Sequence, residues 1–124
     1  EFNWMEDLQM LLFIHLIEPQ LKDYPACFVY DYPKQQCALA QIDGQVAKRF
    51  ELYLNGVEVA NGYQELQSAE DYRHRFNNEL AKRKQLSKST STIDEQFLQE
   101  LEEDLPFCSG VAIGIERLFS LIGL

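Results

Sequence analysis

Basic residues are scarce in this sequence: 11 lysines and arginines stand against 20 aspartates and glutamates, which gives a formal net charge of −9. Such a chain has no general basic surface, so a nucleic-acid partner would need a local patch or another part of the protein. The 124 residues are 46% hydrophobic, which is enough for one ordinary domain with its own core.

Cysteine and histidine are scarce as well. Cys27, Cys37 and Cys108 are an odd number without metal-ligand spacing, and the two histidines lie far apart in the sequence. This pattern argues against both a disulfide framework and a zinc site. It favours buried thiols in a reducing compartment, and we therefore expect a cytoplasmic protein.

Long hydrophobic runs are also missing. The apolar run 10–17 is interrupted by His15 and is far shorter than the roughly 20 residues that a membrane span needs. No signal-peptide pattern precedes this run. We therefore expect no membrane partner for this chain.

Helical periodicity opens the chain. Asn3 followed by Glu6 resembles a capping box, and the pattern predicts a helix up to the stop at Glu18–Pro19. Apolar residues cover more than one side of it: Trp4, Leu8, Met10, Leu11, Leu12, Phe13, Ile14, Leu16 and Ile17. We expect this helix to pack in the core and to be covered on more than one side, by this chain or by one that is missing.

The rest of the chain alternates strands and helices. The expected elements are a strand over 26–32 closed by Pro33, a hairpin around Asn55–Gly56, a helix from the capping box Ser68–Asp71 to near Leu86, a helix from Asp94 to Pro106, a strand over 109–113 and a helix that begins near Glu116 and Arg117. These elements predict an α+β fold, in which an antiparallel β-sheet is flanked by helices.

The hairpin RFELYLNGVEVANGYQEL places acidic side chains among apolar ones. Asn55–Gly56 predicts a two-residue type I′ turn, with Glu51 opposite Ala60. Glu51 and Glu58 then share one face as diagonal neighbours, about 7–8 Å apart at the backbone. Two carboxylates at this spacing could converge on one divalent ion. The alternative is that this face is simply solvated, as in many half-buried sheets.

A second dipeptide favours the ligand-binding interpretation. Strict alternation would aim Asn61 at the apolar face, where an unpaired amide is costly, so we expect a bulge at Asn61–Gly62 that turns it back towards the carboxylates. Glu65 could then join the same site. Carboxylates together with an amide suit a Mg²⁺–phosphate complex or a ligand that bears ammonium groups.

The end of the chain, SGVAIGIERLFSLIGL, places the small residues Gly110, Ala112 and Gly114 along a strand, where a flat ligand could approach the backbone. Arg117 heads the following helix, a position suited to a polyphosphate. Close packing between strands is an equally good explanation of the glycines.

These segments together resemble a known family. RFELYLNGVEVANGYQEL is similar to a hairpin of the lysyl type of class II aminoacyl-tRNA synthetases, GVAIGIERL is similar to motif 3 of that class, and EDYRHRF fits the linker helix between them. The resemblance implies that residues 1–124 form the C-terminal portion of a class II catalytic domain, with motif 3 at 109–124 and motifs 1 and 2 absent. It also implies a homodimer through the class II core.

The resemblance assigns roles to individual residues. For the nucleotide, it implies that Glu51 and Glu58 serve a Mg²⁺–ATP site, that the main chain at Leu52 lies against the ribose, that Gly114 contacts the nucleotide, and that Arg117 contacts ATP phosphates or the adenine face. For the amino acid, it implies that Asn61 contacts the α-carboxylate of lysine and that Glu65 binds the ε-ammonium of lysine. Glu58 and Ala112 would also lie near the amino acid. The implied chemistry is attack of the lysine carboxylate on the α-phosphorus of ATP. Positioning and charge neutralisation would supply most of the catalysis.

Within the family, PKQQCALAQIDG and CSGVAIG are closer to the lysyl-synthetase paralogues that attach lysine or β-lysine to elongation factor P. Ala112 stands where lysyl-tRNA synthetases usually have glycine, and one methyl group in an amino-acid pocket can change which isomer fits. The alternatives are a portion of a lysyl-tRNA synthetase that charges tRNA, and a non-catalytic binding module. Because the arginine that grips the α-phosphate belongs to motif 2, we expect this chain alone to be inactive.

Overall fold

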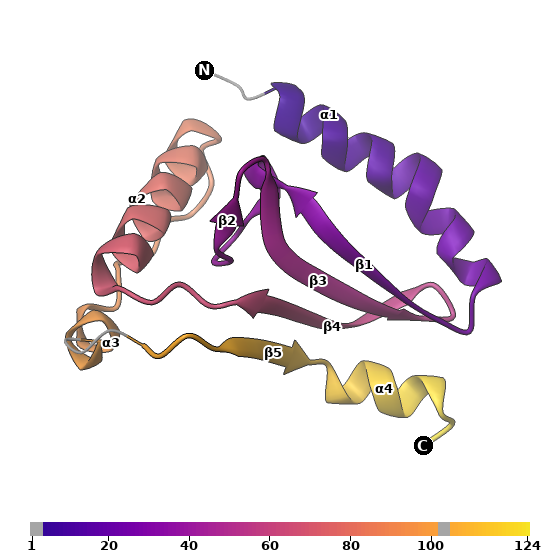
Figure 1. The fold of residues 1–124 in the computed structure, drawn as a ribbon. Coiled ribbons are helices and arrows are strands. Elements are labelled where there is room, and N and C mark those ends of the chain that lie inside the picture. Colours follow the sequence, from indigo (N-terminus) through magenta and orange to yellow (C-terminus); the bar gives the residue numbers. More distant parts are fainter. Residues whose placement is uncertain (1–3, 102–104) are drawn as a thin grey trace.

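The computed structural model describes residues 4–101 and 105–124, and its centre is an antiparallel β-sheet (Figure 1). The strands are β1 (Ala26–Pro33), β2 (Ile42–Asp43), β3 (Val46–Leu54), β4 (Val57–Gln64) and β5 (Ser109–Ile113). They lie in the order β1-β3-β4-β5, and the short β2 pairs with the start of β3. All of these pairings are antiparallel.

Helices flank this sheet: α1 (Trp4–Leu12), α2 (Ala69–Gln85), α3 (Glu95–Glu100) and α4 (Ile115–Leu121). α1 runs beside β1, whereas α2 and α3 lie together at the end of the sheet where β4 ends and β5 begins, and α4 follows β5 directly (Figure 1). The α+β architecture predicted from the sequence is thus confirmed. In the described ranges, none of the helices is long and apolar enough to cross a membrane.

The first helix differs from its prediction. Its α-helical part ends at Leu12 and continues as a π-helical segment, Phe13–Ile17, and a 3₁₀ segment, Glu18–Asp23. At the expected stop, Glu18–Pro19, the helix changes type: the π-helical segment ends at Ile17 with Glu18 as its C-cap, and the 3₁₀ segment takes over. Pro19 lies in the first turn of the 3₁₀ segment, where its missing N–H costs no hydrogen bond. Asn3 of the expected capping box lies outside the described residues.

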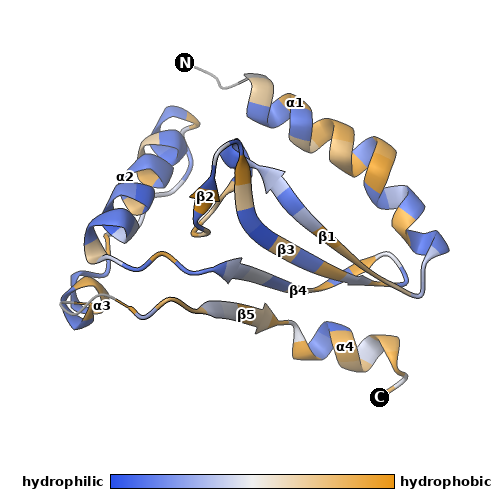
Figure 2. Ribbon diagram, in the orientation of Figure 1, coloured by the Kyte–Doolittle hydropathy of each residue, from blue (hydrophilic) through white to orange (hydrophobic). Residues whose placement is uncertain are grey.

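The expected core packing of this helix is wrong for this chain. No residue from 5 to 20 is buried, and Leu21 is the first that is. Large apolar side chains on its surface are more than 40% exposed: Met5, Leu8, Met10, Leu11, Leu12, Ile14, Leu16 and Ile17. Figure 2 shows several hydrophobic bands along α1 and its continuation. The helix therefore keeps an apolar surface that residues 4–101 and 105–124 do not cover.

The hairpin between β3 and β4 confirms its turn and corrects its register. Asn55 and Gly56 have φ values of 49° and 76°, as a type I′ turn requires. The register then shifts between Leu52 and Tyr53, so that Glu51 pairs with Asn61 and not with Ala60. The bulge therefore lies nearer the turn than expected, and it moves Ala60 to the opposite face of the sheet.

The face that carries the carboxylates is the more buried face of β3. Glu51 and Tyr53 are 6% and 3% exposed, whereas the apolar neighbours Phe50 and Leu52 are only half-buried. The interpretation that this face is simply solvated is therefore wrong. A buried acidic residue on a strand needs polar partners, and these define the site described below.

A separate apolar cluster joins the helices to the end of β4. Its buried members are Leu66, Tyr72, Leu98 and Leu101, and Phe76 and Leu105 pack against them. Both helices start as predicted, because Ser68 accepts a hydrogen bond from the Asp71 amide and Asp94 accepts one from the Phe97 amide. The cluster fixes α2 and α3 where the chain leaves the sheet.

A glycine in the middle of β4 gives a test of this packing. A Cβ at Gly62 would overlap the Phe50 ring and lie 2.9 Å from the Gly110 carbonyl oxygen. Because that oxygen belongs to the neighbouring strand, we expect Gly62→Ala to lower the free energy of unfolding by about 1–3 kcal/mol, measured by urea denaturation.

Gly114→Ala is the matched control for this variant. A Cβ at Gly114 meets Arg117 at an ordinary 3.4 Å, and the φ of −78° suits alanine. We expect a change of less than about 1 kcal/mol there. Equal losses for the two variants would contradict the close approach of β5 at Gly62.

Candidate functional site

The site is built around the buried carboxylate of Glu51. The Tyr32 and Tyr53 hydroxyls donate to its Oε2 at 2.6 Å and 2.9 Å, and the Arg49 guanidinium pairs with its Oε1. Only 8% of the Glu51 side chain is exposed. Donors on both oxygens are what a carboxylate needs in order to remain charged away from water.

Local irregularities of the strands bring these partners together. Arg49, Glu51 and Tyr53 alternate along β3 and so share one face. In β1 the register shifts between Tyr30 and Tyr32, at Asp31, whose φ is 57°. Aspartate tolerates this left-handed conformation better than most residues. The shift places Tyr32 on the same face as Glu51.

Arg49 makes several contacts from one side chain. Its Nε donates to Asn61 Oδ1 at 3.4 Å and its Nη1 to the Gln36 carbonyl at 3.0 Å, and the guanidinium lies 4.5 Å from the centroid of the Tyr32 ring. Sequence reasoning missed Arg49, Tyr32 and Tyr53. The alternation of Arg49 and Tyr53 with Glu51 along β3 was the signal that could have found two of them.

The tyrosines of this site stay neutral. Burial, and then the hydrogen bond to Glu51, raise the pKa of both Tyr32 and Tyr53 above the ordinary value of tyrosine. A phenol with a raised pKa keeps its proton and can go on donating it to a carboxylate. The Glu51 oxygen therefore has two lasting donors.

Glu58 lies across the hairpin from Tyr53, with its side chain half-buried. Burial, and then the negative charge of Glu51, raise the pKa of Glu58, while Arg117 and Arg49 oppose the rise. Arg117 Nη1 lies 3.6 Å from Glu58 Oε2 and donates to the Glu58 carbonyl at 2.9 Å. The structure therefore brings Arg117, from the start of α4, onto the hairpin.

The amide and the small residue predicted for the site are neighbours on adjacent strands. Asn61 of β4 pairs with Ala112 of β5, so their side chains share the face of Glu51. At the N-terminus of α4, the Gly114 amide donates to the Val59 carbonyl at 2.8 Å. Gly114 therefore contacts β4 through its backbone in this structure.

Glu65 lies at the far end of the same face. The Tyr72 hydroxyl donates to its Oε2 at 3.2 Å, and a Cβ at Gly110 would overlap its Oε1. Burial, and then the charge of Glu65, raise the pKa of Tyr72 to about 12. Gly110 thus makes room for a carboxylate of this chain. Leu52 differs from the other predicted residues, because its partner is Ala60 and its side chain is on the opposite face.

The carboxylates suit a cation that is shared with a phosphate ligand. In the part of the chain that the structure describes, no three histidine, cysteine, aspartate or glutamate side chains form a metal cluster. The two carboxylates are still coupled in one direction, since the negative charge of Glu51 contributes to raising the pKa of Glu58. Mg²⁺ commonly takes one or two carboxylates and completes its octahedron with phosphate oxygens and water. These residues therefore fit a Mg²⁺–nucleotide complex better than an all-protein metal cage.

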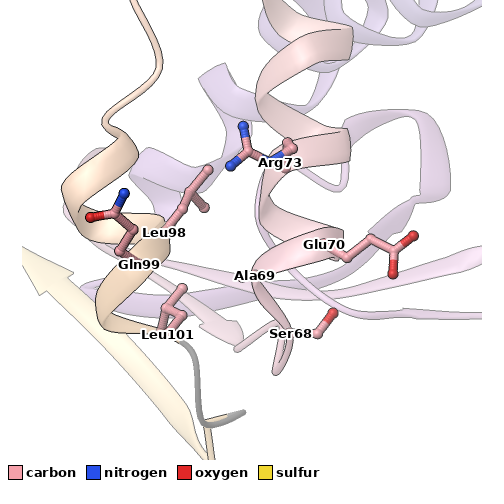
Figure 3. Close-up of a pocket in the computed structure, with 7 residues that line it drawn as sticks. All are labelled: Ser68, Ala69, Glu70, Arg73, Leu98, Gln99 and Leu101. Atoms are coloured by element: carbon pink, nitrogen blue, oxygen red, sulfur yellow. The ribbon is translucent and has the colours of Figure 1, made fainter.

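A hollow between α2 and α3 lies away from this face. Figure 3 shows its lining residues, which are Ser68, Ala69, Glu70, Arg73, Leu98, Gln99 and Leu101. None of the residues predicted for the site is among them. The hollow is next to the apolar cluster of the helices and has no part in the arrangement around Glu51.

Comparison with known proteins gives one family and a consistent set of relatives. The family of class II tRNA synthetases (D, K and N) matches residues 6–123. Proteins named elongation factor P (R)-beta-lysine ligase from Haemophilus influenzae and Proteus mirabilis are 43% identical over 119 residues, and one from Pectobacterium atrosepticum is 44% identical over 120. Each match covers 94% of this chain and 37% of the relative. The chain therefore spans about a third of the length of the curated relatives it matches.

The raised pKa of Glu58 predicts how its removal affects stability. The folded state holds the Glu58 proton more tightly than the unfolded chain, so ionisation of Glu58 costs stability above the ordinary glutamate pKa of about 4.3. We expect Glu58→Gln to be more stable than the wild type at pH 7. The gain should shrink as pH falls and vanish below about pH 4. Urea denaturation across this pH range measures it.

Glu95→Gln is the matched control for this experiment. The hydrogen bond from Arg73 lowers the pKa of Glu95, so this variant should show no gain in stability at pH 7. A Glu58→Gln protein that is no more stable than the wild type at neutral pH would contradict the strained environment of Glu58.

Proposed function

Because this chain belongs to the class II tRNA synthetases (D, K and N), we propose that the protein containing it is an ATP-dependent ligase that activates lysine or β-lysine and transfers it to elongation factor P. The observation that carries the proposal is the shared sheet face on which Glu51, Glu58 and Asn61 meet. The named function of the relatives supports the acceptor.

The proposed reaction begins with the substrate carboxylate. One of its oxygens forms a bond to the α-phosphorus of ATP, the bond from that phosphorus to pyrophosphate breaks, and an aminoacyl adenylate results. A nucleophile of the acceptor then attacks the carbonyl carbon, and AMP leaves. Neither step needs a covalent bond to the protein, so the side chains act by orientation and by charge.

Each charged group of the site has a proposed partner in the substrates. Asn61 donates to the substrate carboxylate, Glu65 accepts from the side-chain ammonium, and Ala112 borders the amino-acid pocket. The nucleotide lies along the main chain at Leu52 and Gly114. Mg²⁺, held by Glu51 and Glu58 together with phosphate oxygens, would neutralise charge on the phosphates.

Arg117 is the residue proposed to act on ATP. Its guanidinium pairs with Glu58 in this structure, but its side chain is 60% exposed, so the pair is weak and easily exchanged. A polyphosphate offers Arg117 more acceptor oxygens than a single carboxylate does. We therefore propose that Arg117 moves from Glu58 to the ATP phosphates.

The remaining length of the relatives has a role in this proposal. The chain corresponds to 37% of those proteins. We propose that motifs 1 and 2 of the class belong to the length that this chain does not cover. We propose that these 124 residues form the C-terminal portion of the catalytic domain, in the cytoplasm, and are inactive without the rest. The exposed apolar surface of α1 is consistent with a homodimer through the class II core.

A second candidate function is the charging of tRNA. The family name refers to tRNA synthetases, and activation of lysine is the same chemistry in both cases. Ala112 is the residue against it, because the lysyl-tRNA synthetases usually have glycine at this position. The third candidate is a binding module that keeps the fold without the activation step.

Exchange of pyrophosphate into ATP tests the proposal directly. We expect the full-length protein to exchange labelled pyrophosphate in the presence of lysine or β-lysine, and to transfer labelled amino acid to elongation factor P. The 124-residue chain serves as the control and should show no exchange above background. Label on tRNA would support the second candidate function. The absence of exchange by the full-length protein would contradict both ligase functions and favour the third candidate, the binding module.

The methyl group of Ala112 gives a test of substrate choice. It lies beside Asn61 on the adjacent strand, so it limits the space next to the proposed carboxylate position. One methyl group in such a pocket is worth roughly 10-fold to 200-fold in discrimination. We expect Ala112→Gly to change the ratio of kcat/KM for β-lysine and lysine by about 10-fold in favour of lysine. An unchanged ratio would show that Ala112 does not border the amino-acid pocket.

A further inference from the structure

We propose that Arg49 is a positioning residue that decides which end of the Asn61 amide faces the substrate. The inference rests on the proposed function, and it gives a role to Arg49, which has none in that function. Arg49 is the only described residue whose side chain joins Glu51 and Asn61. Its side chain is 15% exposed, so it acts from inside the site.

The direction of one hydrogen bond carries the proposal. Arg49 Nε–H donates, and Asn61 accepts through Oδ1 at 3.4 Å. A guanidinium has donors and no acceptors, so it can bind only the oxygen end of an amide. The Asn61 Nδ2 group is left as the free end, and within the described ranges it has no hydrogen-bond partner. A free NH₂ group is what an anionic carboxylate needs, whereas a free carbonyl oxygen would repel it.

The position of Arg49 is itself fixed from three sides. Glu51 neutralises its charge, the Gln36 carbonyl accepts from Nη1 at 3.0 Å, and the Tyr32 ring lies 4.5 Å below the guanidinium. A planar group held in this way cannot rotate to follow Asn61. Lysine would keep the charge beside Glu51, but its single nitrogen cannot reach three acceptors in fixed directions. Arginine and lysine are therefore not equivalent here.

The experiment compares two ligands in the full-length protein. Lysine carries the α-carboxylate, and lysinamide replaces it with a neutral amide that does not need a donor group from Asn61. Binding of each is measured by calorimetry in the wild type and in Arg49→Lys, and the KM values for lysine and ATP are measured by pyrophosphate exchange. We expect the Kd and KM for lysine to rise roughly tenfold or more in Arg49→Lys, because a hydrogen bond to a charged group is lost.

The other quantities should move little. The Kd for lysinamide and the KM for ATP should change by less than about threefold, as hydrogen bonds of neutral groups contribute less. A role limited to holding the fold would weaken both ligands alike, and that result would overturn the proposal. Unchanged lysine binding would overturn it as well. Arg73→Lys is the matched control, because Arg73 also pairs with a glutamate, Glu95, but on the exposed side of α2.

A second variant covers the case in which Arg49→Lys folds poorly. Asn61→Asp leaves Arg49 and Glu51 in place and substitutes an oxygen for Nδ2. We expect it to lose lysine binding by at least tenfold while it still binds lysinamide. Lysine binding equal to that of the wild type would overturn the proposal.

Measurements on the wild type distinguish a failure of the proposed function from a failure of the role proposed for Arg49. If it exchanges pyrophosphate and binds lysine, a failure of the variants to behave as stated counts against Arg49 alone. If the wild type neither binds lysine nor exchanges pyrophosphate, the proposed function fails, and the role of Arg49 fails with it.

Discussion

Water cannot stabilise the carboxylate of Glu51, because the side chain is almost fully buried, and the surrounding strands supply its donors instead. Tyr32 comes from β1, Arg49 and Tyr53 from β3, and the same guanidinium reaches Asn61 of β4. One ion pair therefore joins three neighbouring strands. Loss of either partner would leave a buried charge uncompensated, which typically costs several kcal/mol, about 3–5 in measured cases. The geometry of the whole face depends on this pair.

Two strand irregularities make that convergence possible. Side chains alternate along a strand, so an inserted residue moves every later side chain to the other face. The shift at Asp31 brings Tyr32 to Glu51, and the shift beyond Glu58 brings Asn61 to the same face. Without the second shift, Ala60 would face Glu51 and the amide would point away. The bulges are thus the structural basis of the site.

The sequence predicted the hairpin turn and the starts of α2 and α3, but neither the position of the bulge nor the exposure of the first helix. Asn55–Gly56 predicted the turn, because both of its residues favour a positive φ, and the capping residues Ser68 and Asp94 predicted the helix starts. The place of the bulge did not follow, since nothing in VEVANG distinguishes one inserted residue from its neighbours. The burial of the first helix did not follow either, because its apolar residues indicate a partner without specifying which chain provides it.

The two ends of the site differ in how firmly they are held. Glu51 is fixed by buried donors with raised tyrosine pKa values, whereas Glu58 and Arg117 form a pair that is open to solvent. A pair of that kind contributes little to stability, so a ligand can exchange with it at low cost. Burial and the charge of Glu51 already raise the pKa of Glu58, so a cation at this point would relieve a repulsion that the fold maintains. The charge of Glu51 thereby makes the surroundings of Glu58 electrostatically more favourable for a positively charged group.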